Sequence, residues 1–259
     1  MSIGIFDSGI GGVTVLHQAL RLMPNENYIF YSDPLNAPYG EKSREDIKKY
    51  TFQAAEFLAA QNIKALVIAC NTATSVAIED LRNRYEFPIV GIEPAIKPAV
   101  RKWQGSKKNI MVLATNLTLR EKKYTNLLKS LELEDNVKGV ALPGLVDFAE
   151  RLEFREEKVI PYLKQMLVSY RLEEYDTVVL GCTHFPYFIN SIRTVFPSGV
   201  EILSGNYGTV NRLKNILNIS NQDNKGKGSI VYYQSGLKVE DTAVLAVFSD
   251  LIKTLDHIQ

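Results

Sequence analysis

The apolar positions of the chain fall into short continuous runs separated by amphipathic stretches. Short runs with few polar residues are typical of buried strands. We predict strands at residues 3–6, 27–31, 65–70, 89–92, 110–114, 137–142, 177–182, 200–203 and 230–233. Helical periodicity occupies most of the intervals between these runs. Because strands alternate with helices, the pattern predicts β-α-β units with parallel sheets.

The predicted helices begin at residues that suit a helix start. Ser43 followed by Asp46 is similar to a capping box, which predicts a helix from there to about residue 61. Other helices are predicted from 13 to about 20, from 71 to about 85, and from just after 118 to about 130. One more helix should begin at about 146, and another should end at about 170. The last predicted helices follow residue 182, occupy 210–217 and end the chain. Turn residues predict a loop at 33–40, and polar residues predict another at 221–228.

Two interruptions of this alternation suggest a division into lobes. Glu93-Pro94, with Pro98 shortly after, breaks the pattern once, and the segment 204–208 breaks it again. We interpret these as an outward and a return crossing between two similar α/β lobes. Each lobe is predicted to hold a mostly parallel sheet flanked by helices, with the active site in the cleft between them. The predicted lobes are residues 1–95 together with 207–259, and residues 96–206.

Two of the apolar runs end in the same way. One leads into Cys70-Asn71-Thr72 and the other into Cys182-Thr183, and these are the only cysteines in the chain. Ligands of open α/β proteins bind beyond the carboxyl ends of the parallel strands. We therefore predict that the two thiols face each other across one site.

Each cysteine alone has simpler interpretations. A lone cysteine after an apolar run is more often a core residue than a catalytic one. A disulfide is not indicated, because two cysteines in 259 residues form no disulfide framework. A zinc site is not indicated either, because no C-x-x-C or H-x-x-x-H spacing occurs. The repetition of a cysteine beside threonine at the end of two strands is what favours a functional interpretation.

Composition limits the classes of function. The chain is 46% hydrophobic and 23% charged, with a net charge of +1, so no strong electrostatic field points to nucleic acid or an anionic membrane. No apolar run approaches the roughly 20 residues that span a bilayer. Residues 1–20 lack a basic region followed by an apolar core, so we expect a cytoplasmic protein with reduced thiols.

Two opposed thiols are suited to inverting a carbon centre. A thiolate on one face can remove an α-proton, and a thiol on the other face can deliver one. Each cysteine is expected to precede a helix, whose N-terminus lowers a thiol pKa and favours a bound carboxylate. Asn71, Thr72 and Thr183 are placed to orient an amino acid. The sequence shows no obvious cofactor motif, although pyridoxal phosphate has no short sequence signature.

Four segments together resemble the bacterial glutamate racemases of the aspartate/glutamate racemase family. They are 6–12 (FDSGIGG), 37–40 (APYG), 69–74 (ACNTAT) and 180–186 (LGCTHFP), in the family's order. The resemblance implies racemisation of L-glutamate to D-glutamate for peptidoglycan without a cofactor or metal. It also implies that the partners are the two enantiomers of glutamate, and that the chain forms a homodimer.

The resemblance also implies roles for individual residues. Cys182 would act on L-glutamate and Cys70 on D-glutamate. Asp7 would assist on the Cys70 side, with His184 and Glu150 on the Cys182 side. The residues that would hold the α-amino and α-carboxylate groups are Ser8, Asn71, Thr72 and Thr183. Those that would line the pocket for the side-chain carboxylate are Pro38, Tyr39, Gly40, Thr115 and Thr118.

Other interpretations remain open at this point. A racemase of aspartate or another acidic amino acid would share both thiols. A lyase or decarboxylase would need only one thiol, and a binding protein would need neither. Asp7 alone is also typical of a turn or helix cap, and His17, in an amphipathic helix, is expected to be exposed.

Overall fold

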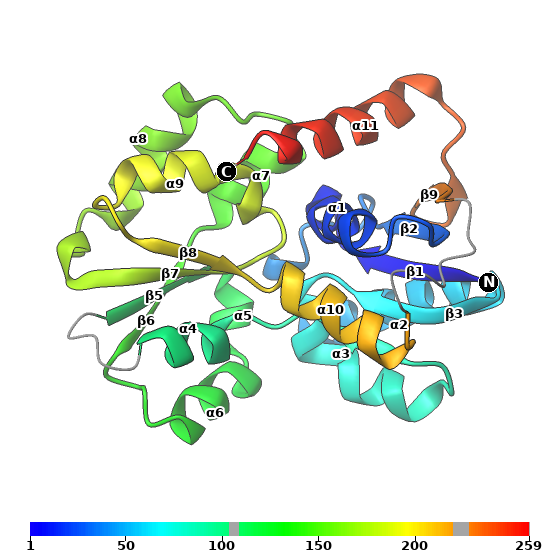
Figure 1. The fold of residues 1–259 in the computed structure, drawn as a ribbon, viewed down its shortest axis with the longest axis horizontal. Coiled ribbons are helices and arrows are strands. Elements are labelled where there is room, and N and C mark those ends of the chain that lie inside the picture. The colour runs from blue at the N-terminus through cyan, green and yellow to red at the C-terminus, as the bar shows by residue number, and fades with distance from the viewer. Residues whose placement is uncertain (104–108, 220–227, 259) are drawn as a thin grey trace.

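The computed structural model describes residues 1–103, 109–219 and 228–258. Figure 1 shows two sheets side by side with helices around each. The larger sheet has the order β10 (Leu237–Lys238), β9 (Ile230–Gln234), β2 (Tyr28–Ser32), β1 (Ser2–Asp7), β3 (Ile63–Ile68) and β4 (Ile89–Gly91). The smaller sheet has the order β6 (Val137–Ala141), β5 (Asn109–Ala114), β7 (Tyr175–Gly181) and β8 (Glu201–Ser204). All the pairings are parallel except that of β9 with β10, so the predicted α/β class is confirmed.

The two sheets share one strand order. The neighbouring strands are β2-β1-β3-β4 in the larger sheet and β6-β5-β7-β8 in the smaller one. Numbered by their order along the chain, the four strands of each set lie in the sheet order second, first, third, fourth. Phe6 pairs with Ile68 at the carboxyl ends of β1 and β3, and Ala114 pairs with Gly181 at those of β5 and β7. Cys70 lies two residues after β3 and Cys182 directly after β7, so each follows the third strand of its sheet. The point where strand order reverses, between first and third strands, is where such sheets bind ligands.

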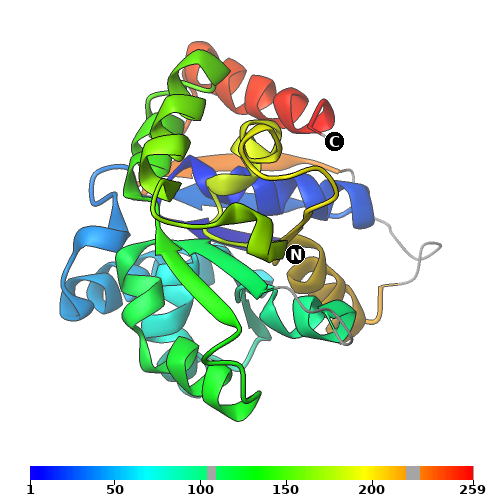
Figure 2. The same cartoon turned by 90° about the vertical axis from the view of Figure 1, so that its left-hand side faces the viewer.

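Helices cover both faces of the two sheets (Figure 2). The α-helices are α1 (Val13–Leu22), α2 (Arg44–Ala60), α3 (Asn71–Arg84), α4 (Ile96–Trp103), α5 (Asn116–Arg120), α6 (Lys122–Ser130), α7 (Pro143–Glu150), α8 (Glu156–Leu167), α9 (Ile189–Val195), α10 (Asn206–Ile216) and α11 (Thr242–Asp256). Short 3-10 helices are η1 (Ile10–Gly12), η2 (Tyr39–Glu41), η3 (Leu172–Glu174) and η4 (Phe185–Phe188). No helix in these described ranges combines the length and apolarity that a membrane crossing requires.

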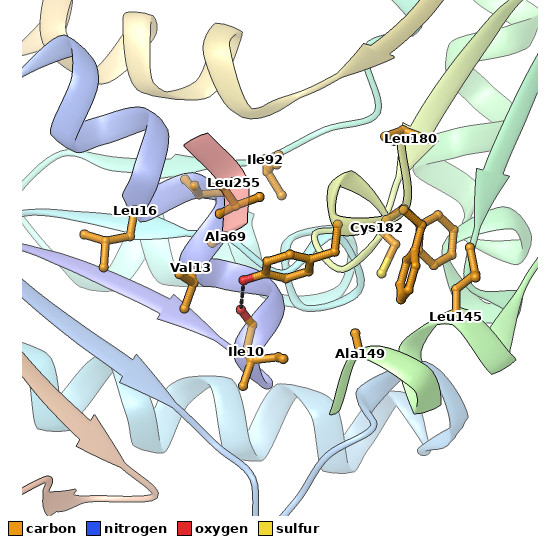
Figure 3. Close-up of a cluster of buried hydrophobic side chains, with 14 of the residues drawn as sticks. Ile10, Val13, Leu16, Ala69, Ile92, Leu145, Ala149, Leu180, Cys182 and Leu255 are labelled. Carbon is orange, nitrogen blue, oxygen red and sulfur yellow. Dashed lines mark hydrogen bonds between the residues drawn. The ribbon is translucent and has the colours of Figure 1, made fainter. Parts of the chain in front are cut away.

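One hydrophobic core continues from one sheet to the other. The same cluster of buried side chains includes Ile5 of the larger sheet and Leu113 of the smaller one. Figure 3 shows Cys182 in this cluster, and the dashed line marks the hydrogen bond in which the Tyr187 hydroxyl donates to the Ile10 carbonyl at 3.3 Å. Because burial of apolar surface is the main force that holds a fold together, this shared core keeps the two strand ends at a defined separation.

The structure corrects several predicted helix limits. The helix predicted to run unbroken to about 130 is divided, because Glu121 has an extended backbone (φ −66°, ψ 138°) between α5 and α6. The helix predicted from about residue 146 begins earlier, at Pro143, since the fixed φ of proline suits the first helical turn. The segment 204–208, which we predicted as the return crossing between the lobes, also contains the start of α10 at Asn206.

Two further predictions need correction or lie outside the described residues. His17 is buried rather than exposed, and its Nε2 lies 2.7 Å from the Asp256 carboxylate at the end of α11. The helix α4 was not predicted, although proline is tolerated in a first turn such as that at Pro98. The predicted loop at 221–228 lies outside the described residues except for Gly228.

Candidate active site

A pocket opens between the carboxyl ends of the two sheets. It is lined by Ser8, Ala37, Pro38, Tyr39, Gly40, Glu41, Cys70, Asn71, Thr72, Thr115, Asn116, Pro143, Val146, Asp147, Glu150, Gly181, Cys182, Thr183 and His184. Of the site residues predicted from the sequence, all but Asp7 and Thr118 are in this lining. Both thiols are therefore brought to one pocket, and neither is in a disulfide.

Cys70 is the residue that caps α3. Its sulfur accepts a hydrogen bond from the Ala73 backbone N–H at 3.4 Å and one from the Ser8 hydroxyl at 3.6 Å. Burial raises the pKa of the Cys70 thiol to about 12, and the charges of Asp7 and Cys182 add to this effect. The two hydrogen bonds oppose it but are the weaker influence. The Ala73 N–H at the start of α3 lowers the pKa of Cys70, as expected for a helix N-terminus, but desolvation of the thiolate outweighs it.

Cys182 lies in a different local setting. It follows β7 and precedes the 3-10 helix η4. The α-helix that we expected directly after Cys182 is therefore replaced by a 3-10 helix. Its sulfur lies 3.6 Å from Nδ1 of His184. Burial lowers the pKa of His184, but hydrogen bonds and charges from Cys182 and Glu150 outweigh burial and raise it well above 6.5. A protonated imidazole at this position can donate a hydrogen bond from Nδ1 to the Cys182 sulfur.

Glu150 connects this pair to the other lobe. Its Oε1 lies 2.6 Å from Nε2 of His184 and also accepts the backbone N–H of Ile10 at 2.9 Å. Burial alone would raise the pKa of Glu150, but the hydrogen bond and charge of His184 bring it below the usual value. The three residues form a chain from Glu150 through His184 to Cys182, and Glu150 fixes the orientation of the imidazole.

Asp7 lies beneath the pocket and is completely buried. Its Oδ2 accepts the backbone N–H groups of Gly9 and Gly12 at 3.2 and 2.9 Å, and its Oδ1 accepts the Thr183 hydroxyl at 3.2 Å. Burial raises the pKa of Asp7 to about 6, against the lowering effect of the His184 charge. The carboxylate therefore shapes the turn after β1, binds the second lobe, and influences Cys70 through its charge.

Three threonines form a hydrogen-bonded cluster at the seam between the lobes. The Thr72 hydroxyl lies 3.2 Å from that of Thr115 and 3.3 Å from that of Thr118. Thr115 caps α5 by accepting the Thr118 backbone N–H at 3.2 Å. Thr118 thus supports Thr72 and Thr115 from behind the pocket wall. This placement makes Thr118 a positioning residue for the two threonines in the lining.

The pocket lining contains few charged side chains. The lining residues include no lysine or arginine, and His184 is the cationic group among them. Asn71 is buried, and its Oδ1 has no hydrogen-bond partner among the described residues. A buried acceptor without a partner is costly unless a ligand or water satisfies it. No three side chains from His, Cys, Asp and Glu gather as a metal site would require in the described ranges.

Several lining residues were not found from the sequence. They are Ala37, Glu41, Asn116, Pro143, Val146, Asp147 and Gly181. Val146 and Asp147 precede Glu150 by four and three positions, so their helical spacing could have placed them on the same face of α7. Asn116 is the first residue of α5 and lies between the predicted site residues Thr115, which caps this helix, and Thr118.

Comparison with known proteins identifies the family. A family model described as Asp/Glu/Hydantoin racemase matches residues 11–213. Glutamate racemase 2 of Bacillus subtilis (strain 168) is 55% identical over 259 residues, covering 100% of this chain and 98% of the relative. The chain therefore belongs to the Asp/Glu/Hydantoin racemase family, and its curated relatives are glutamate racemases, which are isomerases that act on amino acids.

Solved structures agree with this assignment. The crystal structure of glutamate racemase from Campylobacter jejuni subsp. jejuni has a TM-score of 0.83 and 27% identity, and each chain is covered to 100%. Escherichia coli glutamate racemase in complex with L-glutamate and the activator UDP-MurNAc-ala has a TM-score of 0.83 and 28% identity, with 98% of this chain and 95% of the other covered. Both similarities therefore extend over nearly the whole of this chain.

Proposed function

We propose that the protein is a glutamate racemase that interconverts L- and D-glutamate with two thiols and no cofactor. The observation that carries this proposal is the matched position of Cys70 and Cys182. Each follows the third strand of its sheet, and both line one pocket. The relatives of this chain that are named glutamate racemases support the choice of substrate.

The environments of Cys70 and Cys182 suit a reaction that starts from L-glutamate. Because its pKa is raised to about 12, Cys70 is a thiol that can donate a proton. Beside Cys182, the protonated His184 stabilises a thiolate that can accept one. Starting from L-glutamate, the Cys182 thiolate takes the α-proton, and the C–H electron pair remains on the α-carbon. That pair then takes the proton of the Cys70 thiol on the opposite face, which inverts the centre.

The reverse reaction uses the same groups in exchanged roles. Cys70 becomes a thiolate after the first turnover and takes the α-proton of D-glutamate, while Cys182 donates. The charge of Cys182 raises the pKa of Cys70, so having both sulfurs charged at once is disfavoured. This coupling maintains one base and one acid, which is the arrangement a two-base racemase requires.

The α-carbanion must be stabilised by the pocket, because an amino-acid α-proton is only weakly acidic. Preorganised hydrogen-bond donors in a buried site are the strongest source of such stabilisation. We assign the α-amino and α-carboxylate groups to Ser8, Asn71, Thr72 and Thr183. We assign the side-chain carboxylate to Pro38, Tyr39, Gly40 and Thr115, with Thr118 supporting Thr115 from behind.

We further propose that Asp7, His184 and Glu150 assist the proton transfers. Asp7 acts on the Cys70 side through its charge, since it raises the pKa of that thiol. His184 acts directly on Cys182, and Glu150 holds His184 in place. The thiol and the two assisting groups on the Cys182 side are thus in hydrogen-bond contact, whereas Asp7 acts from beneath the pocket.

The biological setting is part of the proposal. D-glutamate would supply peptidoglycan synthesis, and the reduced thiols that the mechanism needs are maintained in the cytoplasm. Expression of the chain should then restore growth of a bacterial D-glutamate auxotroph, and the Cys70→Ser variant should not. We also propose a homodimer in solution, which light scattering on the purified protein would test against the monomer mass of 29.1 kDa.

Hydrogen isotope exchange tests the two-thiol mechanism. Wild-type protein is incubated with L-glutamate in D₂O without added cofactor, and both enantiomers are followed by circular dichroism and mass spectrometry. We expect deuterium at the α-carbon of D-glutamate from its first appearance, and slower labelling of the remaining L-glutamate. Substantial transfer of the original hydrogen into D-glutamate would contradict the mechanism. L-aspartate in a parallel reaction distinguishes a glutamate racemase from a racemase of shorter acidic amino acids.

Serine variants of the two cysteines complete the test. Cys70→Ser and Cys182→Ser should each lose nearly all racemisation, because a serine hydroxyl is a much weaker acid than a thiol. General acid–base groups typically contribute about 10²–10⁴-fold. A lyase or decarboxylase that needs one thiol would lose activity in only one variant and would release a different product.

A further inference from the structure

A carboxylate outside the pocket lining holds the loop that forms one pocket wall. Asp33, at the end of β2, is buried with 4% of its surface exposed. The loop that follows it, residues 34–41, contributes Ala37, Pro38, Tyr39, Gly40 and Glu41 to the pocket. The mechanism described above does not use Asp33.

Side chains from two distant parts of the chain converge on this carboxylate. The Tyr39 hydroxyl donates to Oδ2 at 2.7 Å, and Nδ2 of Asn36 lies 3.1 and 3.0 Å from the two oxygens. The third donor is the Ser235 hydroxyl, which donates to Oδ1 at 2.7 Å. Asp33 therefore links the pocket loop to the hairpin between β9 and β10, about 200 residues later in the chain.

Ser235 has an unusual backbone for its residue type. Its φ is 45°, and Gly236 follows with a φ of 87°, so the two residues form a tight hairpin turn in the left-handed region. Glycine, asparagine and aspartate are favoured at such positions, and serine pays a conformational penalty there. The serine hydroxyl offsets this penalty, because it bonds Asp33 and also accepts the Leu35 backbone N–H at 3.3 Å.

We propose that Asp33 and Ser235 are positioning residues for glutamate binding. Together they hold the 34–41 loop in the conformation that receives the side-chain carboxylate, with Tyr39 as the link to the pocket. Because the loop contacts the substrate away from the α-carbon, it contributes equally to the ground state and the transition state. Loss of such uniform binding raises KM and leaves kcat unchanged. This inference rests on the proposed function for the identity of the substrate.

The variant Ser235→Gly separates the hydroxyl from the backbone effect. Glycine adopts a positive φ without the penalty that serine has, so the turn conformation is retained while the bonds to Asp33 and Leu35 are lost. Asp33→Asn keeps the size of the side chain but replaces one acceptor with a donor. Ser229→Ala is the matched control, because Ser229 lies just before the same strand and its hydroxyl bonds Asn27 rather than Asp33.

The expected result is a rise in KM in both directions. For Ser235→Gly and Asp33→Asn we expect KM for L- and D-glutamate to rise about tenfold, which corresponds to about 1.4 kcal/mol, with kcat within about twofold of wild type. Ser229→Ala should match wild type in both constants. A purely structural role would instead lower the melting temperature without separating KM from kcat. Unchanged KM in both variants would overturn the proposal while leaving the racemase assignment intact.

Hydrogen exchange gives a readout that does not depend on the substrate. The amides of Asn36 and Ala37 donate to the Asp33 carbonyl, so loop order can be followed at these positions in the free protein. We expect faster exchange across 34–41 in both variants but not in Ser229→Ala. If wild-type protein failed to racemise glutamate, the proposed function would fall, and this measurement would still decide whether Asp33 and Ser235 order the loop. Equal exchange rates in all four proteins would refute that role.

Discussion

Replacement of Gly11 by alanine tests whether close contact between the lobes positions the catalytic groups. Gly11 belongs to η1 of the first lobe and lies against the loop that follows β7 of the second. A Cβ atom there would lie 2.5 Å from Nδ1 of His184 and 2.5 Å from Oγ1 of Thr183. Its φ is outside the left-handed region, so the backbone accepts alanine and the clash is the only new effect.

The size of the effect follows from these distances. Ordinary contact begins near 3.4 Å, so both side chains must move by roughly 1 Å. Such a shift separates His184 from Cys182 and Thr183 from Asp7. A 1 Å misplacement of a catalytic group can reduce the rate about 10²-fold. We therefore expect Gly11→Ala to lower kcat by about 10²-fold in both directions, measured by circular dichroism with L- and D-glutamate.

Gly208→Ala provides the control for this experiment. Gly208 lies in α10, where an added Cβ meets nothing within 4 Å. Alanine in a helix is more favourable than glycine by roughly 0.5–1 kcal/mol, so this variant should keep its activity and melt at a slightly higher temperature. A Gly11→Ala protein with wild-type kcat would refute the view that the seam between η1 and the Cys182 loop sets the geometry of the site.

Three other predictions concern charge and capping. Glu150→Gln should move the alkaline limb of the kcat profile to lower pH, because the charge of Glu150 raises the pKa of His184. Glu153→Gln should not, because Glu153 pairs with Arg155 instead of His184. Burial raises the pKa of Asp7 from 3.8 to about 6, so its proton stabilises the fold below pH 3.8, and this contribution is lost as pH rises through 6. The unfolding free energy of wild type relative to Asp7→Asn should thus fall by about 2 kcal/mol between pH 4 and 7 in urea titrations, and a constant difference would contradict the assigned shift. Ser43→Ala should destabilise the protein by about 1 kcal/mol in the same assay, since the side chain caps α2, and an unchanged midpoint would refute the cap.

Local patterns in the sequence were enough to determine the fold class and the residues at the strand ends. Continuous apolar runs located every strand of the two sheets apart from β10, which is only two residues long. The two cysteines were found because each directly follows such a run, and a strand end is a local property. Ser43 and Asp46 likewise form the predicted cap, with the backbone N–H of Asp46 donating to the Ser43 hydroxyl at 3.1 Å.

The protonation of the site was decided by the tertiary structure alone. The helix N-terminus at Cys70 is visible in the sequence, but the burial that reverses its effect on the pKa depends on both lobes. The contact of Glu150 with Ile10 joins residues 140 positions apart, and that of Ser235 with Asp33 joins residues 202 positions apart. A one-dimensional pattern records which side chains share a helix face or follow a strand. Desolvation and long-range hydrogen bonds arise only when separate segments pack together, so they belong to the folded molecule.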